Sequence, residues 1–226
     1  MSLNFKTTKE VDDASLFLAS AILGKLNEGK RVLFFVGGGS GIPVSVKFSE
    51  ILREKADEEK LKNLVVMLMD ERYGELDHTD SNWRQLREKG FSLPGVNLIP
   101  ILDGSNMETT VEKFKENLER EFKNAEYKIA LFGIGKDGHT AGILPNSPAT
   151  VETGLAFGYD TETFSRVTMT FPVIQKLDEA VVWAQGEEKW SVLLDLENEV
   201  PLEKMPAQIL KKIPLVTIFS DFYKHE

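Results

Sequence analysis

The sequence contains no cysteine and only three histidines among its 226 residues. The absence of cysteine excludes disulfides, thiolate catalysis and cysteine-ligated zinc. No run of about 18 apolar residues occurs, so no membrane-spanning helix is expected. The first residues, MSLNFKTTKEVDD, lack the apolar segment of a secretory signal, and we therefore expect a cytoplasmic protein.

Basic residues are in the minority. Lys and Arg number 27 against 36 Asp and Glu, which gives a formal charge of −9. Such a chain is poorly suited to unassisted binding of nucleic acid or of an anionic membrane, so neither is an expected partner. If the protein binds an anion, it must use local arginines or backbone amides. The length and the 42% hydrophobic content fit one globular domain over residues 1–226.

Apolar runs alternate with helical patterns along the chain. The apolar runs predict strands at 31–36, 64–69, 97–101, 128–132, 166–171, 180–184 and 214–219. Helical spacing predicts helices at about 14–29, 43–59, 82–89, 107–122 and 187–197. The stretch 145–165 has no clear periodicity and is expected to be a loop bordering a site. The alternation predicts an α/β fold with a mainly parallel sheet covered on both faces.

Three of the predicted strands end in glycine-rich or charged sequence. In an open parallel sheet, ligands bind outside the carboxyl ends of the strands. If the strands at 31–36, 64–69 and 128–132 are parallel neighbours, the segments that follow them lie on one rim of the sheet. That convergence is a stronger indication of a site than any single motif.

The first of these segments is GGGSG at 37–41, which precedes a helix beginning near Pro43. Glycines let backbone N–H groups approach a ligand closely, and a helix N-terminus favours a bound phosphate. A tight strand-to-helix turn that binds nothing explains the same sequence equally well. No Gly-Lys-Ser/Thr follows, which excludes the phosphate loop of nucleoside triphosphatases.

The second segment begins with Asp70, Glu71 and Arg72, and continues to His78 and the sequence Asp-Ser-Asn at 80–82. The guanidinium of Arg72 can bind a phosphate, and the two carboxylates can either act on a substrate or hold Arg72 in place. A surface ion-pair cluster is the alternative interpretation. We expect His78 at the surface and residues 80–82 at the start of a helix, as a cap.

The third segment, GIGKDGH at 133–139, matches G-x-G-x-x-G. A dinucleotide-binding loop should open a long helix and be followed about 20 residues later by an acid at the end of the next strand. Pro145 interrupts the segment and Glu152 has no strand pattern before it, so we interpret the match as coincidental. The glycines then serve to present Asp137 and His139. Histidine is suited to proton transfer near neutral pH, although a structural histidine is the alternative.

Together these segments resemble the 6-phosphogluconolactonase family, which belongs to a wider group with glucosamine-6-phosphate deaminases. GIGKDGHTAGILPNSPA resembles the family's histidine signature, and VGGGSG resembles its phosphate loop. DER and the later HTDSNW resemble the family's Asp-Glu-Arg and His-x-Asp-Ser-Asn segments. RVTMTFPVI resembles its Arg-x-Thr-x-Thr strand, and GEEKW resembles its Gly-x-x-Lys segment. All five occur in the family's order, so the resemblance spans most of the chain.

The resemblance implies a three-layer, Rossmann-like α/β fold and hydrolysis of 6-phospho-D-glucono-1,5-lactone to 6-phosphogluconate in the pentose phosphate pathway. It implies His139 as the general base that activates water, with Asp137 positioning His139 or the sugar. The residues that it implies for substrate binding are Gly38, Gly39, Ser40, Asp70, Glu71, Arg72, Arg166 and Lys189.

Two alternatives to the lactonase remain at this point, an amino-sugar-phosphate deaminase or isomerase and a sugar-phosphate sensor without catalysis. At the position of Leu144, the resembling segment of the deaminases has glutamate. At the position of Arg72, deaminases tend to have tyrosine. Both differences favour the lactonase. Gly41 replaces the threonine of the family's phosphate loop, and this difference leaves the sensor hypothesis as an alternative. His78, Asp80 and His139 lack the spacing of a metal site. We therefore expect a small sugar phosphate as ligand, no metal, no cofactor, and a monomer.

Overall fold

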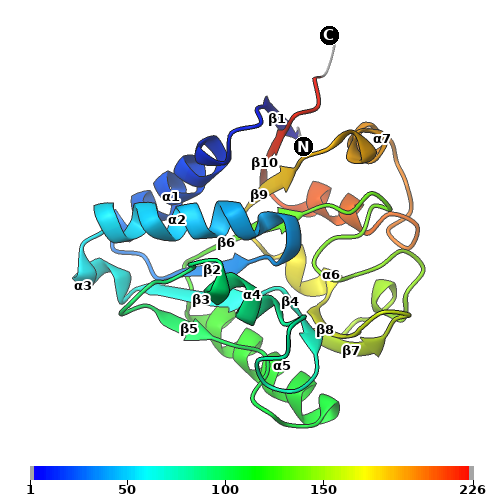
Figure 1. Cartoon of the computed structure of the whole chain (residues 1–226), viewed down its shortest axis with the longest axis horizontal. Helices are drawn as coiled ribbons and strands as arrows, with labels where there is room; N and C mark the ends of the chain where they lie inside the picture. The colour runs from blue at the N-terminus through cyan, green and yellow to red at the C-terminus, as the bar shows by residue number, and fades with distance from the viewer. Residues whose placement is uncertain (1–2, 224–226) are drawn as a thin grey trace.

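The computed structural model describes residues 3–223, and its central feature is a seven-stranded sheet (Figure 1). Every neighbouring pair in this sheet is parallel. In spatial order the strands are β1 (Asn4–Thr7), β10 (Leu215–Ser220), β9 (Glu179–Ala184), β6 (Tyr127–Gly133), β2 (Val32–Val36), β3 (Leu64–Leu68) and β5 (Asn97–Ile99). The predicted parallel sheet is confirmed, and β1 is a strand that the sequence patterns did not predict.

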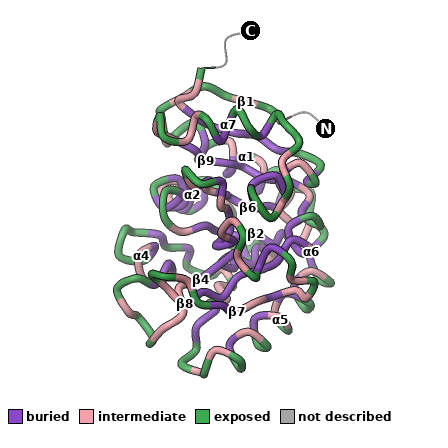
Figure 2. The backbone as a smooth tube through the Cα atoms, turned by 90° about the vertical axis from the view of Figure 1, so that its right-hand side faces the viewer, coloured by how far each residue is buried: buried purple, intermediate pink, exposed green. Residues whose placement is uncertain are grey.

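Helices cover both faces of this sheet. Successive side chains of a strand point to opposite faces, so Phe34 and Phe35 of β2 contact the helices on opposite faces of the sheet. The Phe34 ring packs 4.9 Å from Phe48 of α2 (Ile42–Lys55), and the Phe35 ring packs 5.8 Å from Phe122 of α5 (Met107–Asn124). The tube coloured by burial shows the enclosed strands in purple (Figure 2). The predicted three-layer α/β arrangement is confirmed.

The remaining helices are short apart from α1 (Val11–Asn27), which packs beside α2. They are α3 (Glu58–Leu61), α4 (Asn82–Glu88), α6 (Phe171–Ile174) and α7 (Trp190–Asp195), with 3-10 turns η1 (Gly39–Gly41), η2 (Pro148–Thr150), η3 (Glu187–Lys189) and η4 (Pro206–Lys212). The helix predicted at 43–59 is in fact two, because Ala56 is extended and Asp57 caps a new turn. Across residues 3–223, no helix is long and apolar enough to cross a bilayer.

A second, three-stranded antiparallel sheet stands beside the first and corrects two predictions. Its order is β4 (Asp70–Tyr73), β8 (Ser165–Met169) and β7 (Ala156–Asp160). Asp70, expected just outside the strand at 64–69, therefore begins a strand of its own, and part of 145–165, expected to be a loop, is also a strand. Both strands escape a periodicity search because they are short and polar or glycine-containing. Gly158 of β7 lies against Val111 and Met107 of α5, where a Cβ atom would not fit.

The strands β6, β2 and β3 are adjacent and parallel, with β2 in the middle. Their carboxyl ends consequently lie on one rim, as predicted. The same rim receives β4, which begins two residues after β3 ends, and β4 carries its cross-strand partner β8 with it. The two sheets therefore meet where the three candidate segments meet.

Glu71 ties this junction together. Its carboxylate is 1% exposed and accepts four hydrogen bonds, from the backbone N–H groups of Arg72 (2.7 Å), Asn82 (2.6 Å) and Trp83 (3.0 Å) and from the Ser81 hydroxyl (2.9 Å). Two of these donors are the otherwise unpaired N–H groups at the start of α4. Burial raises the pKa of Glu71, and the four donors oppose that rise. Glu71 thus joins β4 to the first turn of α4.

We predict that Glu71→Ala lowers the free energy of unfolding by about 3 kcal/mol, because it leaves three N–H groups at a buried carboxylate site, and the Ser81 hydroxyl, without an acceptor. Urea denaturation measures the change. Glu75→Ala, at an exposed glutamate four residues further on, is the matched control and should unfold like the wild type. Equal stability of the two variants would contradict this role for Glu71.

Candidate active site

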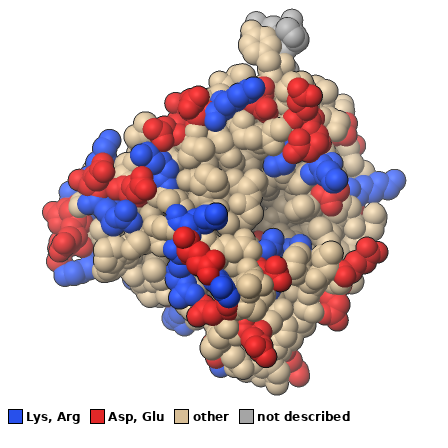
Figure 3. Space-filling view, viewed as in Figure 1, with Lys and Arg blue, Asp and Glu red and all other residues tan. Residues whose placement is uncertain are grey.

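A cavity of about 260 Å³ opens at the rim where the two sheets meet. The space-filling view shows a hollow near the carboxyl ends of the parallel strands, with basic side chains at its border (Figure 3). The residues that line it are Gly37, Gly38, Gly39, Ser40, Met69, Asp70, Arg72, Asn82, Gly133, Ile134, Gly135, His139, Ala141, Gly142, Arg166 and Lys189. All three segments predicted to converge contribute to this wall.

The cavity is cationic although the protein is acidic. Within the described chain it is lined by Arg72, Arg166 and Lys189 against one carboxylate, Asp70. Arg72 and Arg166 are direct cross-strand partners on β4 and β8, and an Arg166 nitrogen lies 3.5 Å from Asp70 Oδ2. Burial lowers the pKa of Lys189, while the charges of Glu188 and Asp221 act in the opposite direction. Such a concentration of positive charge favours an anionic ligand.

His139 and Asp137 form a hydrogen-bonded pair on the loop after β6. His139 Nδ1 lies 2.6 Å from Asp137 Oδ1, and the same oxygen accepts the His139 backbone N–H at 3.2 Å. Burial raises the pKa of Asp137, but the His139 charge and these hydrogen bonds outweigh it and lower the pKa overall. An ionised Asp137 selects the tautomer with hydrogen on Nδ1, which leaves Nε2 free to accept a proton.

Local packing explains why glycine occupies positions of the G-x-G-x-x-G match, without any role in nucleotide binding. A Cβ atom at Gly135 would overlap the His139 ring and approach Asp137 Oδ1 to 2.6 Å. Gly138 has a positive φ of 82°, and a Cβ there would meet Met205 at 2.9 Å. No long helix follows, because the chain passes through an irregular segment to η2. The interpretation of the match as coincidental therefore agrees with the loop's geometry.

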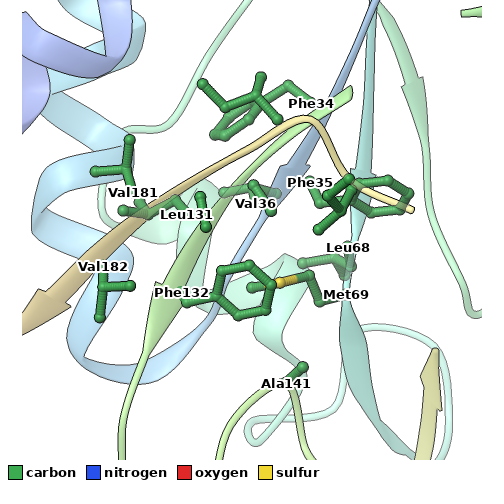
Figure 4. Close-up of a cluster of buried hydrophobic side chains, with 14 of the residues drawn as sticks. Phe34, Phe35, Val36, Leu68, Met69, Leu131, Phe132, Ala141, Val181 and Val182 are labelled. Atoms are coloured by element: carbon green, nitrogen blue, oxygen red, sulfur yellow. The ribbon is translucent and has the colours of Figure 1, made fainter. Parts of the chain in front are cut away.

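The wall beyond His139 is a bent segment fixed through its carbonyl groups. Ala141 and Gly142 have positive φ angles of 49° and 72°. The Thr168 hydroxyl donates to the Ala141 carbonyl, and the Tyr159 hydroxyl donates to the Gly142 carbonyl at 2.6 Å. Figure 4 shows Ala141 at the edge of the apolar cluster. The hydrophobic core therefore extends to the cavity wall, which makes that wall rigid.

Asn82 is a cavity residue that sequence reasoning missed. It was expected only as part of a helix cap, whereas the cap is Ser81, which accepts a hydrogen bond from the Arg84 N–H. The Asn82 amide nitrogen donates to the Asp70 carbonyl at 3.0 Å. A Cβ atom at Gly38 would overlap this amide, which explains the glycine. The position after a capping serine, beside charged strand-end residues, is the only sequence signal that could have found Asn82.

Unsatisfied polar atoms gather at the cavity. In the part of the chain that the structure describes, five buried side-chain nitrogen or oxygen atoms have no hydrogen-bond partner. Three belong to cavity residues: Arg72 Nε, Arg166 Nε and Asn82 Oδ1. Buried polar groups are normally paired, so such a cluster calls for an explanation. Two buried donors and one buried acceptor therefore stay unpaired in the residues around this one cavity.

The structure brings together eight of the ten residues predicted for the site. Those that line the cavity are Gly38, Gly39, Ser40, Asp70, Arg72, His139, Arg166 and Lys189. Asp137 contacts His139 from outside this lining. Glu71 lies away from the cavity, and its four hydrogen bonds favour the bracing role over contact with a ligand. The chemical roles of all ten stay predictions.

His78 does not line the cavity, although it lies on the segment that contributes Arg72. His78 Nε2 lies 2.9 Å from the Arg72 carbonyl oxygen, outside the cavity lining. Among the described residues, no group of three or more His, Cys, Asp or Glu side chains is arranged to hold a metal ion.

The fold and this site define a sugar-phosphate enzyme family. The family model for glucosamine-6-phosphate isomerases/6-phosphogluconolactonase matches residues 7–217, and the chain belongs to that family. A Thermotoga maritima protein named 6-phosphogluconolactonase is 32% identical over 192 residues, which cover 79% of this chain and 80% of that protein. A Homo sapiens protein of the same name is 24% identical, over 92% of this chain and 85% of its own.

The fold is also that of solved structures. The crystal structure of a 6-phosphogluconolactonase from Shewanella baltica has a TM-score of 0.80 to this chain, with 24% identity, over 97% of this chain and 98% of that one. A second, from Thermotoga maritima, has a TM-score of 0.78 with 23% identity. The family resemblance stated from the sequence is confirmed.

We predict that the affinity of the protein for inorganic phosphate falls at alkaline pH before the ordinary lysine pKa of 10.5 is reached. Because its pKa is lowered, Lys189 loses its positive charge at a lower pH than an ordinary lysine, while the phosphate keeps its charge. Calorimetric titration measures the affinity. Lys189→Arg keeps its charge and should show a flatter profile, and an equal decline in both proteins would contradict the role of Lys189.

Proposed function

We infer that this protein hydrolyses 6-phospho-D-glucono-1,5-lactone to 6-phosphogluconate, the lactonase step of the pentose phosphate pathway. The observation that carries this inference is that His139, paired with Asp137 behind it, lines the same cavity as Arg72 and Arg166. A phosphorylated lactone needs both, since its ester requires an activated water and its phosphate requires a cationic clamp. The names of the relatives agree with this reaction.

The cationic wall is the proposed phosphate subsite. Arg72 and Arg166 offer guanidinium forks from adjacent strands, and Lys189 adds a third charge. Ser40 and the backbone amides of Gly38 and Gly39 line the same cavity and offer further donors. Gly41 contributes no side-chain hydroxyl, so the arginines and Lys189 carry most of the binding. Holding the remote phosphate fixes the lactone ring relative to His139.

The reaction follows from the free Nε2 of His139. This nitrogen accepts a proton from water as the water oxygen attacks the lactone carbonyl carbon, which gives a tetrahedral oxyanion. Collapse of the intermediate breaks the bond between that carbon and the ring oxygen. His139 returns the proton to the departing ring oxygen, and the product is an open-chain acid. Asp137 holds the ring orientation and stabilises the transient imidazolium.

Backbone amides of the cavity wall are the groups available to bind the developing oxyanion. Ala141 and Gly142 lie two and three residues after His139, and their carbonyl groups are engaged by Thr168 and Tyr159. The Ala141 carbonyl shares its peptide plane with the Gly142 N–H, so the Thr168 hydrogen bond fixes that N–H, which is the preorganisation that oxyanion binding requires. The Ile143 N–H, in the plane of the Gly142 carbonyl, already donates to the Thr140 carbonyl oxygen at 2.8 Å.

We predict that the wild-type protein accelerates loss of enzymatically generated 6-phosphogluconolactone and that His139→Ala lowers kcat by about 10²- to 10⁴-fold. The spontaneous rate, measured without protein, is subtracted. Acceleration that survives in the variant would exclude His139 as the base. A wild type that binds phosphate but does not accelerate lactone loss would favour a sensor. Turnover of glucosamine 6-phosphate in place of the lactone would favour a deaminase.

A second prediction concerns the glycine that makes room for the pair. Gly135→Ala should lower kcat at least about a hundredfold, because the new methyl group displaces His139 from Asp137. Gly24→Ala is the matched control, since a Cβ at Gly24, in α1, meets nothing within 4 Å. That control should keep full activity and equal or slightly higher stability. Full activity of Gly135→Ala would show that the pair does not depend on this space.

A further inference from the structure

Arg72 and Arg166 lie side by side with little to offset their mutual repulsion. They are directly opposite each other on antiparallel strands, where like charges are destabilising. Asp70 approaches Arg166 only to 3.5 Å, and Arg72 Nη1 donates to the Asp80 carbonyl oxygen at 2.9 Å. The Nε atoms of both arginines are buried without a partner. Something other than a full set of hydrogen bonds must hold the two guanidinium groups in place.

The ring of Phe164 contacts both guanidinium groups. The Arg72 Cζ atom lies 5.1 Å from the ring centroid, and the Arg166 Cζ atom lies 5.5 Å from it. Both distances fall within the range of cation–π attraction, about 6 Å. Phe164 is half-buried and sits outside the cavity lining, so it touches the arginines rather than the space that a ligand would fill.

The backbone of Phe164 is fixed by the turn that joins β7 to β8. Its carbonyl oxygen accepts hydrogen bonds from the Thr161 backbone N–H at 2.8 Å and from the Thr161 hydroxyl at 2.7 Å. Its own N–H donates to the Thr161 hydroxyl oxygen at 3.0 Å. Three hydrogen bonds to one residue fix the backbone from which the ring projects.

An aromatic ring holds cations in a way that suits an anion-binding site. A carboxylate in the place of Phe164 would neutralise the guanidinium charges and compete with an anionic ligand for their N–H groups. A ring attracts the same charges through its electron-rich face and accepts no hydrogen bond from those N–H groups. Arg72 and Arg166 are therefore held in place without a competing carboxylate.

We propose that Phe164 is a positioning residue that holds Arg72 and Arg166 together for joint binding of the substrate phosphate. This role rests on the proposed function only in taking that phosphate as the ligand. The contact requires a flat aromatic face at position 164, so tyrosine should substitute for phenylalanine and leucine should not.

The test compares Phe164→Leu, Phe164→Tyr and the wild type. Phe122→Leu is the matched control, because Phe122 is also half-buried and packs on an aromatic ring away from the cavity. We expect Phe164→Leu to raise the KM for the phosphorylated lactone and the calorimetric Kd for inorganic phosphate about tenfold. Its kcat should stay within about twofold of the wild type, and Phe164→Tyr should restore both constants.

Unchanged phosphate binding in Phe164→Leu would overturn the proposal. So would a loss that Phe164→Tyr does not rescue, or one that Phe122→Leu reproduces together with its loss of thermal stability. The phosphate titration does not depend on turnover. A wild type that binds phosphate but does not hydrolyse the lactone would therefore refute the proposed function alone, while weaker phosphate binding by Phe164→Leu would still support the role of Phe164.

Discussion

The parallel pairing of β2 between β3 and β6 is the constraint on which the rest of this structure depends. All five residues of β2 and of β3 are buried, so these strands can exist only in the middle of a layered fold. Parallel neighbours also require that each connection return to the same starting edge. The carboxyl ends of the three strands must then share a rim, and every polar segment that follows them is brought to one place.

Steric exclusion shapes the site as much as attraction does. Gly38 makes room for the Asn82 amide, Gly135 for the His139–Asp137 pair, and Gly142 for the Asp70 side chain. Each glycine allows a polar group to lie directly against the backbone, at the conformational cost that glycine carries. The result is a cavity whose polar groups come from the segments after three different strands and yet lie close together. The same packing leaves Arg72 Nε, Arg166 Nε and Asn82 Oδ1 buried without a hydrogen-bond partner.

The charge of the cavity runs against the charge of the whole chain. A net charge of −9 repels anions at long range, whereas three cationic side chains around one carboxylate attract them at short range. The arrangement therefore depends on local geometry, above all on the antiparallel register that sets Arg72 opposite Arg166.

Much of the architecture followed from the sequence alone, because continuous apolar runs and helical spacing report burial directly. The helices at α1 and α5, six strands of the parallel sheet and the rim formed by β6, β2 and β3 were all predictable on that basis. His139, Asp137 and the basic residues were identifiable as candidates because their residue types carry the chemistry. Only the tertiary structure decided what each of them touches. Short polar strands such as β4 gain their stability from cross-strand partners almost a hundred residues away, and no local pattern encodes such a partner. For the same reason the bracing position of Glu71, the entry of Asn82 into the cavity and the contact of Phe164 with two arginines became visible only once distant segments were packed together.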